Sequence, residues 1–353
     1  MKLIKWLFTI ALVTLGVLYT ALFTQFGNNI LIPIVEQQAM KSTQIKDIKI
    51  VNFALSFTNF HTNILLDKQT ISLKADFDIA KQIVNSSFIV NIKDLSRFNY
   101  ITKQKLKGSF FTKGELKGTF DKLKLKGLAK IAKGNIDYKL DINKNNIHNI
   151  IVDIKSLDIS TLLYMVNQPK YTSGKLNSKI SISTLKKLKG VIKTTILDVT
   201  LDKKNIENYL NSPAKSSYKN ILNTLLKTNQ TLEKYIHKEL TQEIFKTITI
   251  DTTLDNKIIN NTLFMKSKHS TIKSKKLYTN LEKNYLDAII DLNFYGYNLG
   301  LKLKGDINKP KIKFNISKLL NNKIKQKVKN KLNSFLKNKI KNKDLNNLIN
   351  NLF

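Results

Sequence analysis

The stretch from Leu106 to Ile142 reads LKGSFFTKGELKGTFDKLKLKGLAKIAKGNIDYKLDI, and its alternation of side chains decides the fold class. Ile136, Tyr138, Leu140 and Ile142 are apolar, whereas the residues between them are polar or charged. This two-residue period puts one kind of side chain on each face of a β-strand. Glycine supplies the positive φ that tight turns and bulges require. The stretch therefore predicts an antiparallel β-meander, punctuated by glycines at 108, 114, 118, 127 and 134.

Strands of the same kind are predicted before and after this stretch, because the two-residue period recurs there. The apolar positions of the earlier strands are Val51, Phe53, Leu55 and Phe57; Ile71, Leu73, Ala75, Phe77 and Ile79; and Phe88, Val90 and Ile92. Those of the later strands are Ile248, Ile250 and Leu254; Ile290, Leu292 and Phe294; Leu299, Leu301 and Leu303; and Ile312, Phe314 and Ile316.

The composition excludes several classes of protein. The chain has 353 residues and no cysteine, so disulfides, zinc ribbons and cysteine nucleophiles are ruled out. The formal net charge of +35 is the kind of footprint that phosphate binding leaves. However, nearly all of that charge is lysine, and Arg97 is the sole arginine. Guanidinium is the better group for bidentate phosphate recognition, so we expect no nucleic-acid partner.

The N-terminus predicts a membrane anchor. Residues 6–24 carry no charge and are mostly Leu, Ile, Val, Phe or Ala, enough to span roughly 30 Å as a helix. Lys2 and Lys5 precede this run, and the positive-inside bias then places the N-terminus in the cytoplasm. A cleaved signal peptide is the alternative, but the run is long and no A-x-A-like site follows Phe23. The segment 25–38 is expected to be interfacial.

An internal repeat is visible when the chain is aligned with itself. Residues 89–95 match residues 151–157 at an offset of 62, and residues 125–127 match residues 188–190 at an offset of 63. Each copy is predicted to be a strand, a short partly helical turn (96–100 and 159–166) and a hairpin marked by glycine. Stacking such copies would lengthen one sheet without closing a core.

Two regions have the three-to-four-residue period of helices. The first is a central insert at 203–246, and the second is the lysine-rich segment 317–353. The second can lie on an anionic membrane, or it can cover the sheet as a lid with a solvated lysine face. Its candidate membrane-surface residues are Lys323, Lys327, Lys331, Lys337 and Lys341.

No chemistry of a catalytic site is found in the sequence. His61, His148, His237 and His269 are the only histidines, and none has the spacing of a metal site or a catalytic triad. Glycine-rich phosphate-binding motifs are also missing. We therefore expect no enzyme, no metal and no cofactor.

Several segments together resemble the AsmA-like family of bacterial envelope proteins, the relatives of AsmA and TamB. They are the N-terminal anchor, the meander, IVDIKSLDISTLL at 151–163, GDINKPKIKF at 305–314 and the lysine-rich tail that ends at Phe353. The resemblance implies an inner-membrane anchor that carries a periplasmic, curved antiparallel β-sheet groove with an apolar interior. It also implies a role in outer-membrane lipid homeostasis and in phospholipid movement between the membranes.

We therefore expect a mainly β fold with some α: anchor and interfacial segment (1–38), repeated β-meander (39–202), helical insert (203–246), C-terminal strands (247–316) and amphipathic helix (317–353). The expected partners are phospholipid, the inner membrane, and outer-membrane or envelope proteins. A structural envelope scaffold that binds anionic head groups or polysaccharide without carrying lipid is the alternative. The candidate residues of the lipid groove are Ile71, Leu73, Phe77, Ile136, Tyr138, Leu140 and Ile142.

Overall fold

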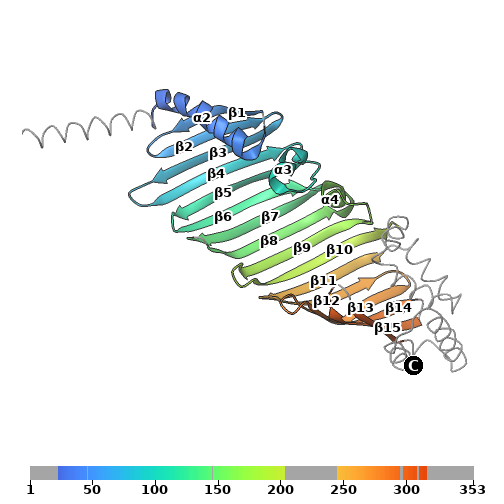
Figure 1. Cartoon of the computed structure of the whole chain (residues 1–353). Coiled ribbons are helices and arrows are strands. Elements are labelled where there is room, and N and C mark those ends of the chain that lie inside the picture. Colours follow the sequence, from blue (N-terminus) through green and yellow to red (C-terminus); the bar gives the residue numbers. More distant parts are fainter. Residues whose placement is uncertain are drawn as a thin grey trace, which may run out of the picture. The chain divides into compact units, whose positions relative to one another are not determined.

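The computed structural model describes residues 23–45, 47–144, 146–202, 245–294, 297–307 and 310–315. The fold is mainly β, and the described strands, β1 to β16, are hydrogen-bonded to their neighbours in the order in which they occur in the chain (Figure 1). The pairs for which the register is known are all antiparallel. The predicted meander is thereby confirmed, and it extends over both sides of the insert at 203–246.

The chain divides into two compact units, with the boundary inside β8. The first unit contains α2 (Gln25–Thr43), β1 (Ile48–Leu55), β2 (Asn59–Leu66), β3 (Gln69–Asp78), β4 (Ile83–Ile92), η1 (Leu95–Phe98), α3 (Asn99–Thr102), β5 (Phe110–Thr119), β6 (Lys122–Ile131), β7 (Gly134–Asn143) and the first half of β8 (Asn146–Asp158). The second unit contains the other half of β8, β9 (Thr172–Thr184), β10 (Lys189–Leu201), β11 (Phe245–Asp255), β12 (Ile258–Lys266), β13 (Ser270–Asn280), β14 (Tyr285–Phe294), β15 (Tyr297–Asp306) and β16 (Lys311–Asn315). The helix α4 (Ile159–Met165) follows β8.

Helix α2 runs alongside β1 and covers the edge of the sheet (Figure 1). The Asn28 side chain accepts a hydrogen bond from the Leu55 N–H and donates one to the Leu55 carbonyl, both at 3.3 Å. The Glu36 carboxylate accepts from the Ile50 N–H at 2.6 Å. An edge strand exposes its backbone N–H and carbonyl groups, which can then pair with other chains. Residues 25–38, predicted to be interfacial, are thus part of a helix that closes this edge.

The small core of the first unit lies where α2 meets the first strands. Ile45, Ile48 and Leu66 are buried there, and Ala39 and Met40 of α2 pack against them with Ile64, Ile71 and Phe98. Among the described helices, α2 is the one with extensive contact to a strand, and that strand is β1.

No helix among the described residues is both long and apolar enough to cross a membrane. The predicted span lies outside the described residues except for Phe23 and Thr24.

A β-bulge in β1 corrects the predicted pattern of that strand. The register with β2 shifts between Ile50 and Asn52, so the strand changes phase at Val51. Val51 is 54% exposed, although the two-residue period grouped it with Phe53 and Leu55. A bulge inserts one extra residue into a strand and thereby moves the residues before it to the other phase.

The helical turns predicted for the internal repeat are confirmed. The strand β4 is followed by η1 and α3, and β8 is followed by α4. The second match of the repeat does not join equivalent positions, because Leu125 lies in the middle of β6 whereas Leu188 lies in the turn before β10 with φ 29°. Of the insert predicted at 203–246, residues 203–244 lie outside the described residues, and Phe245 and Lys246 begin β11.

Candidate functional site

One face of the first unit carries most of its apolar side chains, because the strand registers bring them into line. In the middle of the sheet, Leu73 of β3 lies opposite Phe88 of β4. The next row runs through Leu116, Leu125 and Leu140, which are opposite one another on β5, β6 and β7. We call this surface the apolar face and define it by Ile64, Ile71, Leu73, Phe77, Phe88, Val90, Leu116, Leu125, Ile136, Tyr138, Leu140 and Ile142.

All seven residues predicted for a groove lie on the apolar face, and each is half-buried. They form two groups, on β3 and on β7, with β4, β5 and β6 between them. The intervening residues, such as Phe88 and Leu125, were not predicted as site residues. Their alternation is the same as that of β7, but only the register shows that they complete the same surface.

A pair of glycines marks the centre of the apolar face. Gly114 and Gly127 lie directly opposite each other on β5 and β6. A Cβ atom on Gly114 would lie 2.6 Å from the Phe88 ring, and one on Gly127 would lie 2.5 Å from the Tyr138 hydroxyl. The rings of Phe88 and Tyr138 therefore occupy the space that side chains would fill. These glycines were predicted to serve turns and bulges, and the structure corrects this: they make room for two aromatic rings.

The turn between β6 and β7 also differs from the prediction. Ala132 and Lys133 have φ 46° and 60°, the left-handed conformation that a two-residue hairpin turn requires. Gly134, the predicted turn residue, is the first residue of β7. Gly108 does have a positive φ, 84°, and lies in the segment between α3 and β5, where its Cα faces the side chain of Met165.

The hydroxyl groups on the apolar face are bonded within the protein. Thr112 is buried, and its Oγ1 lies 3.0 Å from the Leu128 carbonyl and 2.7 Å from the Tyr138 Oη. Ser86 donates to the Leu116 carbonyl at 3.3 Å. Because these groups are satisfied internally, the surface that they leave behaves as apolar. Thr62 Oγ1 is the exception, since it is buried without a hydrogen-bond partner among the described residues.

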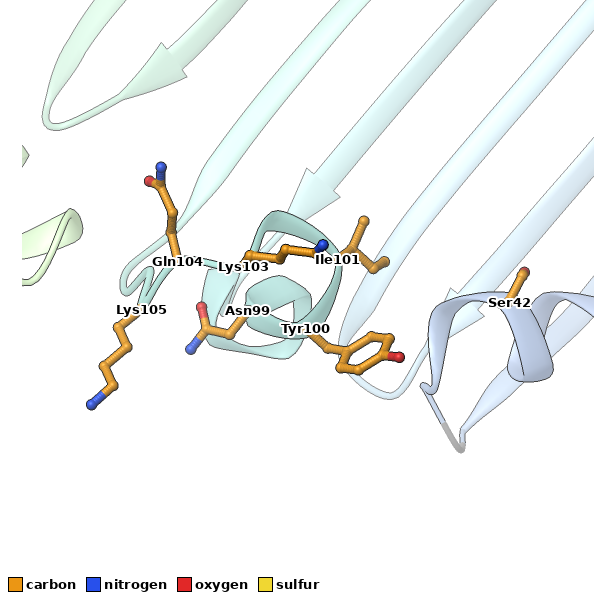
Figure 2. Close-up of a pocket in the computed structure, with 7 residues that line it drawn as sticks. All are labelled: Ser42, Asn99, Tyr100, Ile101, Lys103, Gln104 and Lys105. Carbon is orange, nitrogen blue, oxygen red and sulfur yellow. The ribbon is translucent and has the colours of Figure 1, made fainter.

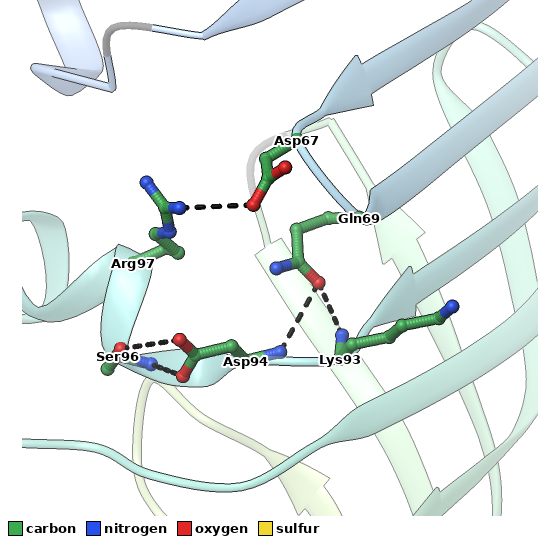
Figure 3. A network of polar contacts seen from close by, with 6 residues as sticks. All are labelled: Asp67, Gln69, Lys93, Asp94, Ser96 and Arg97. Atoms are coloured by element: carbon green, nitrogen blue, oxygen red, sulfur yellow. Dashed lines mark hydrogen bonds and ion pairs between the residues drawn. The ribbon is translucent and has the colours of Figure 1, made fainter.

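The strand ends beside η1 are held by a polar network (Figure 3). Gln69 is 1% exposed, and its Oε1 accepts hydrogen bonds from the N–H groups of Lys93 and Asp94. Asp94 caps η1 by accepting from the Ser96 N–H and hydroxyl, both at 2.9 Å, and these bonds lower the pKa of its carboxyl. Arg97, the sole arginine, pairs with Asp67 at 3.1 Å. Its role here is to tie η1 to the β2–β3 turn.

An open pocket of about 620 Å³ lies between the end of α2 and α3. It is lined by Ser42, Asn99, Tyr100, Ile101, Lys103, Gln104 and Lys105. Figure 2 shows the Tyr100 ring directed toward Ser42, whereas the Lys105 side chain points away from it. The Asn99 side chain is used internally, because its Oδ1 accepts from the Leu106 N–H at 2.7 Å. Because the Lys105 side chain points away from the pocket, Lys103 and Lys105 do not converge on one point within it (Figure 2).

The second unit has an apolar face built in the same way. Ile192, Ile196 and their neighbours on β9 and β11 are aligned by the register. Val199, Phe245 and Ile248 are buried there, and Ile196, Ile250, Leu263 and Met265 pack against them. Two polar pairs interrupt it: Ser178 with Thr194 at 2.9 Å, and Thr252 with Asn261 at 2.6 Å.

The opposite face of the first unit is rich in lysine. Lys113, Lys117, Lys124 and Lys126 lie there with Glu115. Glu115 pairs with Lys117 at 2.9 Å and with Lys126 at 3.3 Å, and these two lysines lower the pKa of its carboxyl. Within the described part of the chain, no group of three or more His, Cys, Asp or Glu side chains could hold a metal ion.

A single carboxyl of the second unit has a strongly shifted pKa. Asp158 accepts from the Thr161 hydroxyl at 2.7 Å and from the Thr161 N–H at 2.8 Å, and it pairs with Lys175 at 3.3 Å. The Thr161 bonds, reinforced by Lys175, lower its pKa to about 2. Its position before α4 makes it a helix cap, so its role is structural.

The five lysines predicted to meet a membrane, at 323, 327, 331, 337 and 341, lie outside the described residues. Comparison of the chain with protein-family models, with curated proteins and with solved structures finds no match. We take the apolar faces of the two units as the candidate functional site.

Proposed function

We propose that this protein is an AsmA-like, inner-membrane-anchored protein of the bacterial envelope that holds acyl chains on the apolar faces of its sheet. The observation that carries the proposal is the apolar face of the first unit, which the registers make continuous from β2 to β7. Soluble proteins rarely leave a large contiguous apolar patch without a partner. Acyl chains are long and apolar, and they match a surface of this kind.

The extent of the cover over the apolar face supports this choice. Among the described residues, Ala39 and Met40 of α2 and Phe98 pack against the buried cluster of Ile45, Ile48 and Leu66 at the β1 end of the sheet. Ile64 and Ile71 of the apolar face pack against the same cluster. Toward β7, residues such as Leu140 are half-buried. A lipid lying across the strands would remove this surface from water, at a gain of about 25 cal/mol per Å² of apolar area.

The internal bonding of Thr112 and Ser86 favours an apolar ligand over a polar one. Their hydroxyls are already engaged by Leu128, Leu116 and Tyr138, so few donors remain to orient a polar substrate. The ligand would be recognised by area and shape. In this proposal the bulk of the chain is periplasmic, phospholipid is its cargo, and it takes part in outer-membrane biogenesis by moving lipid between the membranes.

Photo-crosslinking of the full chain in cells tests this function. We would place a photoreactive amino acid at Leu140, on the apolar face, and as a matched control at Lys139, the next residue, which is exposed on the opposite face. Crosslinks to phospholipid from position 140 and not from 139 are expected. Crosslinks from position 140 to protein alone would show that the face is covered by another segment or chain and would contradict the proposal.

The lysine-rich face favours a second candidate function, that of a scaffold that binds anionic head groups or polysaccharide without holding acyl chains. On this surface Glu115 pairs with Lys117 and Lys126, and Lys124 lies opposite Asp141 on β7. Lys113 adds further positive charge. Mass spectrometry of protein purified without added lipid separates the two functions. Phospholipid that remains bound in high salt supports the apolar face, because ionic contacts to lysines are screened under that condition.

A further inference from the structure

The turns at one edge of the first unit form a regular row. In an antiparallel meander every second turn lies at the same edge, so the turns β1–β2, β3–β4, β5–β6 and β7–β8 lie together. We call these residues, 56–58, 79–82, 120–121 and 144, the tip rim. Consecutive tips are two strands apart, about 10 Å at the usual strand spacing.

Backbone hydrogen bonds join the tip rim into one structure. The Thr58 carbonyl accepts from the Phe77 N–H at 2.8 Å. The Gln82 carbonyl accepts from the Phe120 N–H at 2.9 Å, and the Asp121 carbonyl accepts from the Lys144 N–H at 2.8 Å. The first bond joins the first tip to Phe77 of β3, two residues before the second tip, and the other two join the second tip to the third and the third to the fourth. The turns are therefore held to their neighbours, unlike separate hairpin ends.

Large apolar side chains are exposed at these tips. Phe57 is 53% exposed, Ile79 is 47% exposed and Phe120 is 51% exposed. Phe57, Ile79 and Phe120 each follow by two residues a position that faces the same side as the apolar face. These positions are Leu55, Phe77 and Gly118. Exposed apolar residues repeated along one edge mark an interaction surface.

The chain itself indicates what this surface meets. The described part of the first unit begins at Phe23, the last apolar residue of the uncharged run 6–24. The Phe23 ring contacts the Phe57 ring edge-on, with the centroids 6.1 Å apart. The end of the predicted anchor therefore lies at the first tip of the rim.

The charge of the rim points to apolar insertion. Lys81 pairs with Asp78 at 3.2 Å, and Asp121 of the third tip precedes Lys122, the first residue of β6. Lys144 of the fourth tip leaves these five residues with a net charge of +1. The opposite edge differs, because η1, α3 and Arg97 lie there. A nearly neutral row of Phe and Ile side chains binds a lipid interface through its apolar area and has little need of anionic lipid.

We propose that the tip rim of the first unit lies in the head-group layer of the membrane that holds residues 6–24, with Phe57 next to the anchor and Ile79 and Phe120 following. The inference rests on the anchor in the proposed function. It adds a surface by which acyl chains leave the bilayer at the tips and reach the apolar face along β3 and β5.

The test is tryptophan quenching in the full chain, reconstituted into phosphatidylcholine vesicles whose acyl chains carry bromine. Trp6, the sole tryptophan, is replaced by Trp6→Phe, and single reporters are introduced as Phe57→Trp, Ile79→Trp or Phe120→Trp. The matched control is Tyr100→Trp, because Tyr100 is an aromatic residue, 59% exposed, at the opposite edge. We expect loss of fluorescence from the three tip reporters and none from position 100.

Equal quenching at position 100 and at the tips, or unquenched reporters at 79 and 120, would overturn the proposal. A reporter at Leu140→Trp separates this result from the proposed function. Quenching of the reporter at position 140, without quenching of the three tip reporters, would support the lipid-holding face and contradict the membrane contact of the rim. Quenching of the three tip reporters, without quenching at position 140, would support the membrane contact of the rim and contradict the lipid-holding face.

Discussion

The hydroxyl of Tyr138 on β7 lies 2.7 Å from the hydroxyl of Thr112 on β5, and the strand between them passes beneath the ring at Gly127. The contact skips one strand, so it fixes three strands at once. It is possible because position 127 has no side chain. A Cβ atom there would also lie 2.6 Å from the Lys113 carbonyl oxygen, a backbone atom that cannot move aside.

We predict that Gly127→Ala destabilises the first unit by about 1–3 kcal/mol, the usual cost of overpacking a well-packed site. Urea denaturation measures the change. Tyr138→Phe in the same chain should recover little of it, because the Lys113 carbonyl remains in the way. Recovery of the full stability by Tyr138→Phe would show that the ring alone requires the glycine.

Replacing Lys133, which is exposed, by glycine should stabilise the β6–β7 turn. Lys133 has φ 60°, a conformation that costs a residue with a side chain roughly 1 kcal/mol and costs glycine nothing. Lys133→Gly is therefore expected to raise the midpoint of urea unfolding. Lys130→Gly, in the same sheet but within β6, serves as the control and should lower it.

The cap of α4 predicts a dependence of stability on pH. The folded-state pKa of Asp158 is about 2, below its ordinary value of 3.8. A lowered pKa stabilises the folded state above pH 3.8, and this contribution disappears as the pH falls from 3.8 through about 2. Asp158→Asn keeps a capping oxygen but does not titrate, so its unfolding free energy should vary less over this window, by about 2 kcal/mol. Identical pH profiles for both proteins would contradict the assignment.

On the apolar face, Leu140→Asp should remove bound lipid with a modest loss of stability. Leu140 is half-buried, so a carboxylate there can still reach water, but it stands where acyl chains would lie. Ala129→Asp is the comparison, because Ala129 is 3% exposed and a charge there should cost several kcal/mol. Lipid per protein is measured by mass spectrometry and stability by denaturation. Lipid retention in folded Leu140→Asp would count against the proposed function.

Uncovering the β1 edge should promote self-association. The double variant Asn28→Ala, Glu36→Ala removes the side chains that bond the Leu55 and Ile50 backbone groups. We expect the exposed edge to pair with other chains, as unprotected edge strands do. Light scattering in detergent measures the oligomeric state, and Gln37→Ala, exposed on the same helix, is the control. A double variant as monodisperse as the control would mean that α2 covers the edge without these bonds.

The sequence by itself determined the β-meander, most of its strands, and the helical turns after β4 and β8. It could do so because the two-residue and three-to-four-residue periods are local and are written in consecutive side chains. The same period was enough to place Ile71, Leu73 and Phe77 on one face of their strand, and Ile136, Tyr138, Leu140 and Ile142 on one face of theirs. A single groove lined by both sets was an expectation drawn from the resemblance to the AsmA-like family.

Only the tertiary structure shows which residues of β4, β5 and β6 connect these two sets into a single face. Which residues lie opposite one another depends on turn lengths and on pairing between strands, and the bulge at Val51 and the turn at Ala132 and Lys133 are settled only when the strands pair. The same holds for Gly114 and Gly127, whose neighbours Phe88 and Tyr138 come from other strands. A glycine in the sequence shows that no side chain is present at that position. Only the packed sheet shows which aromatic ring occupies the space.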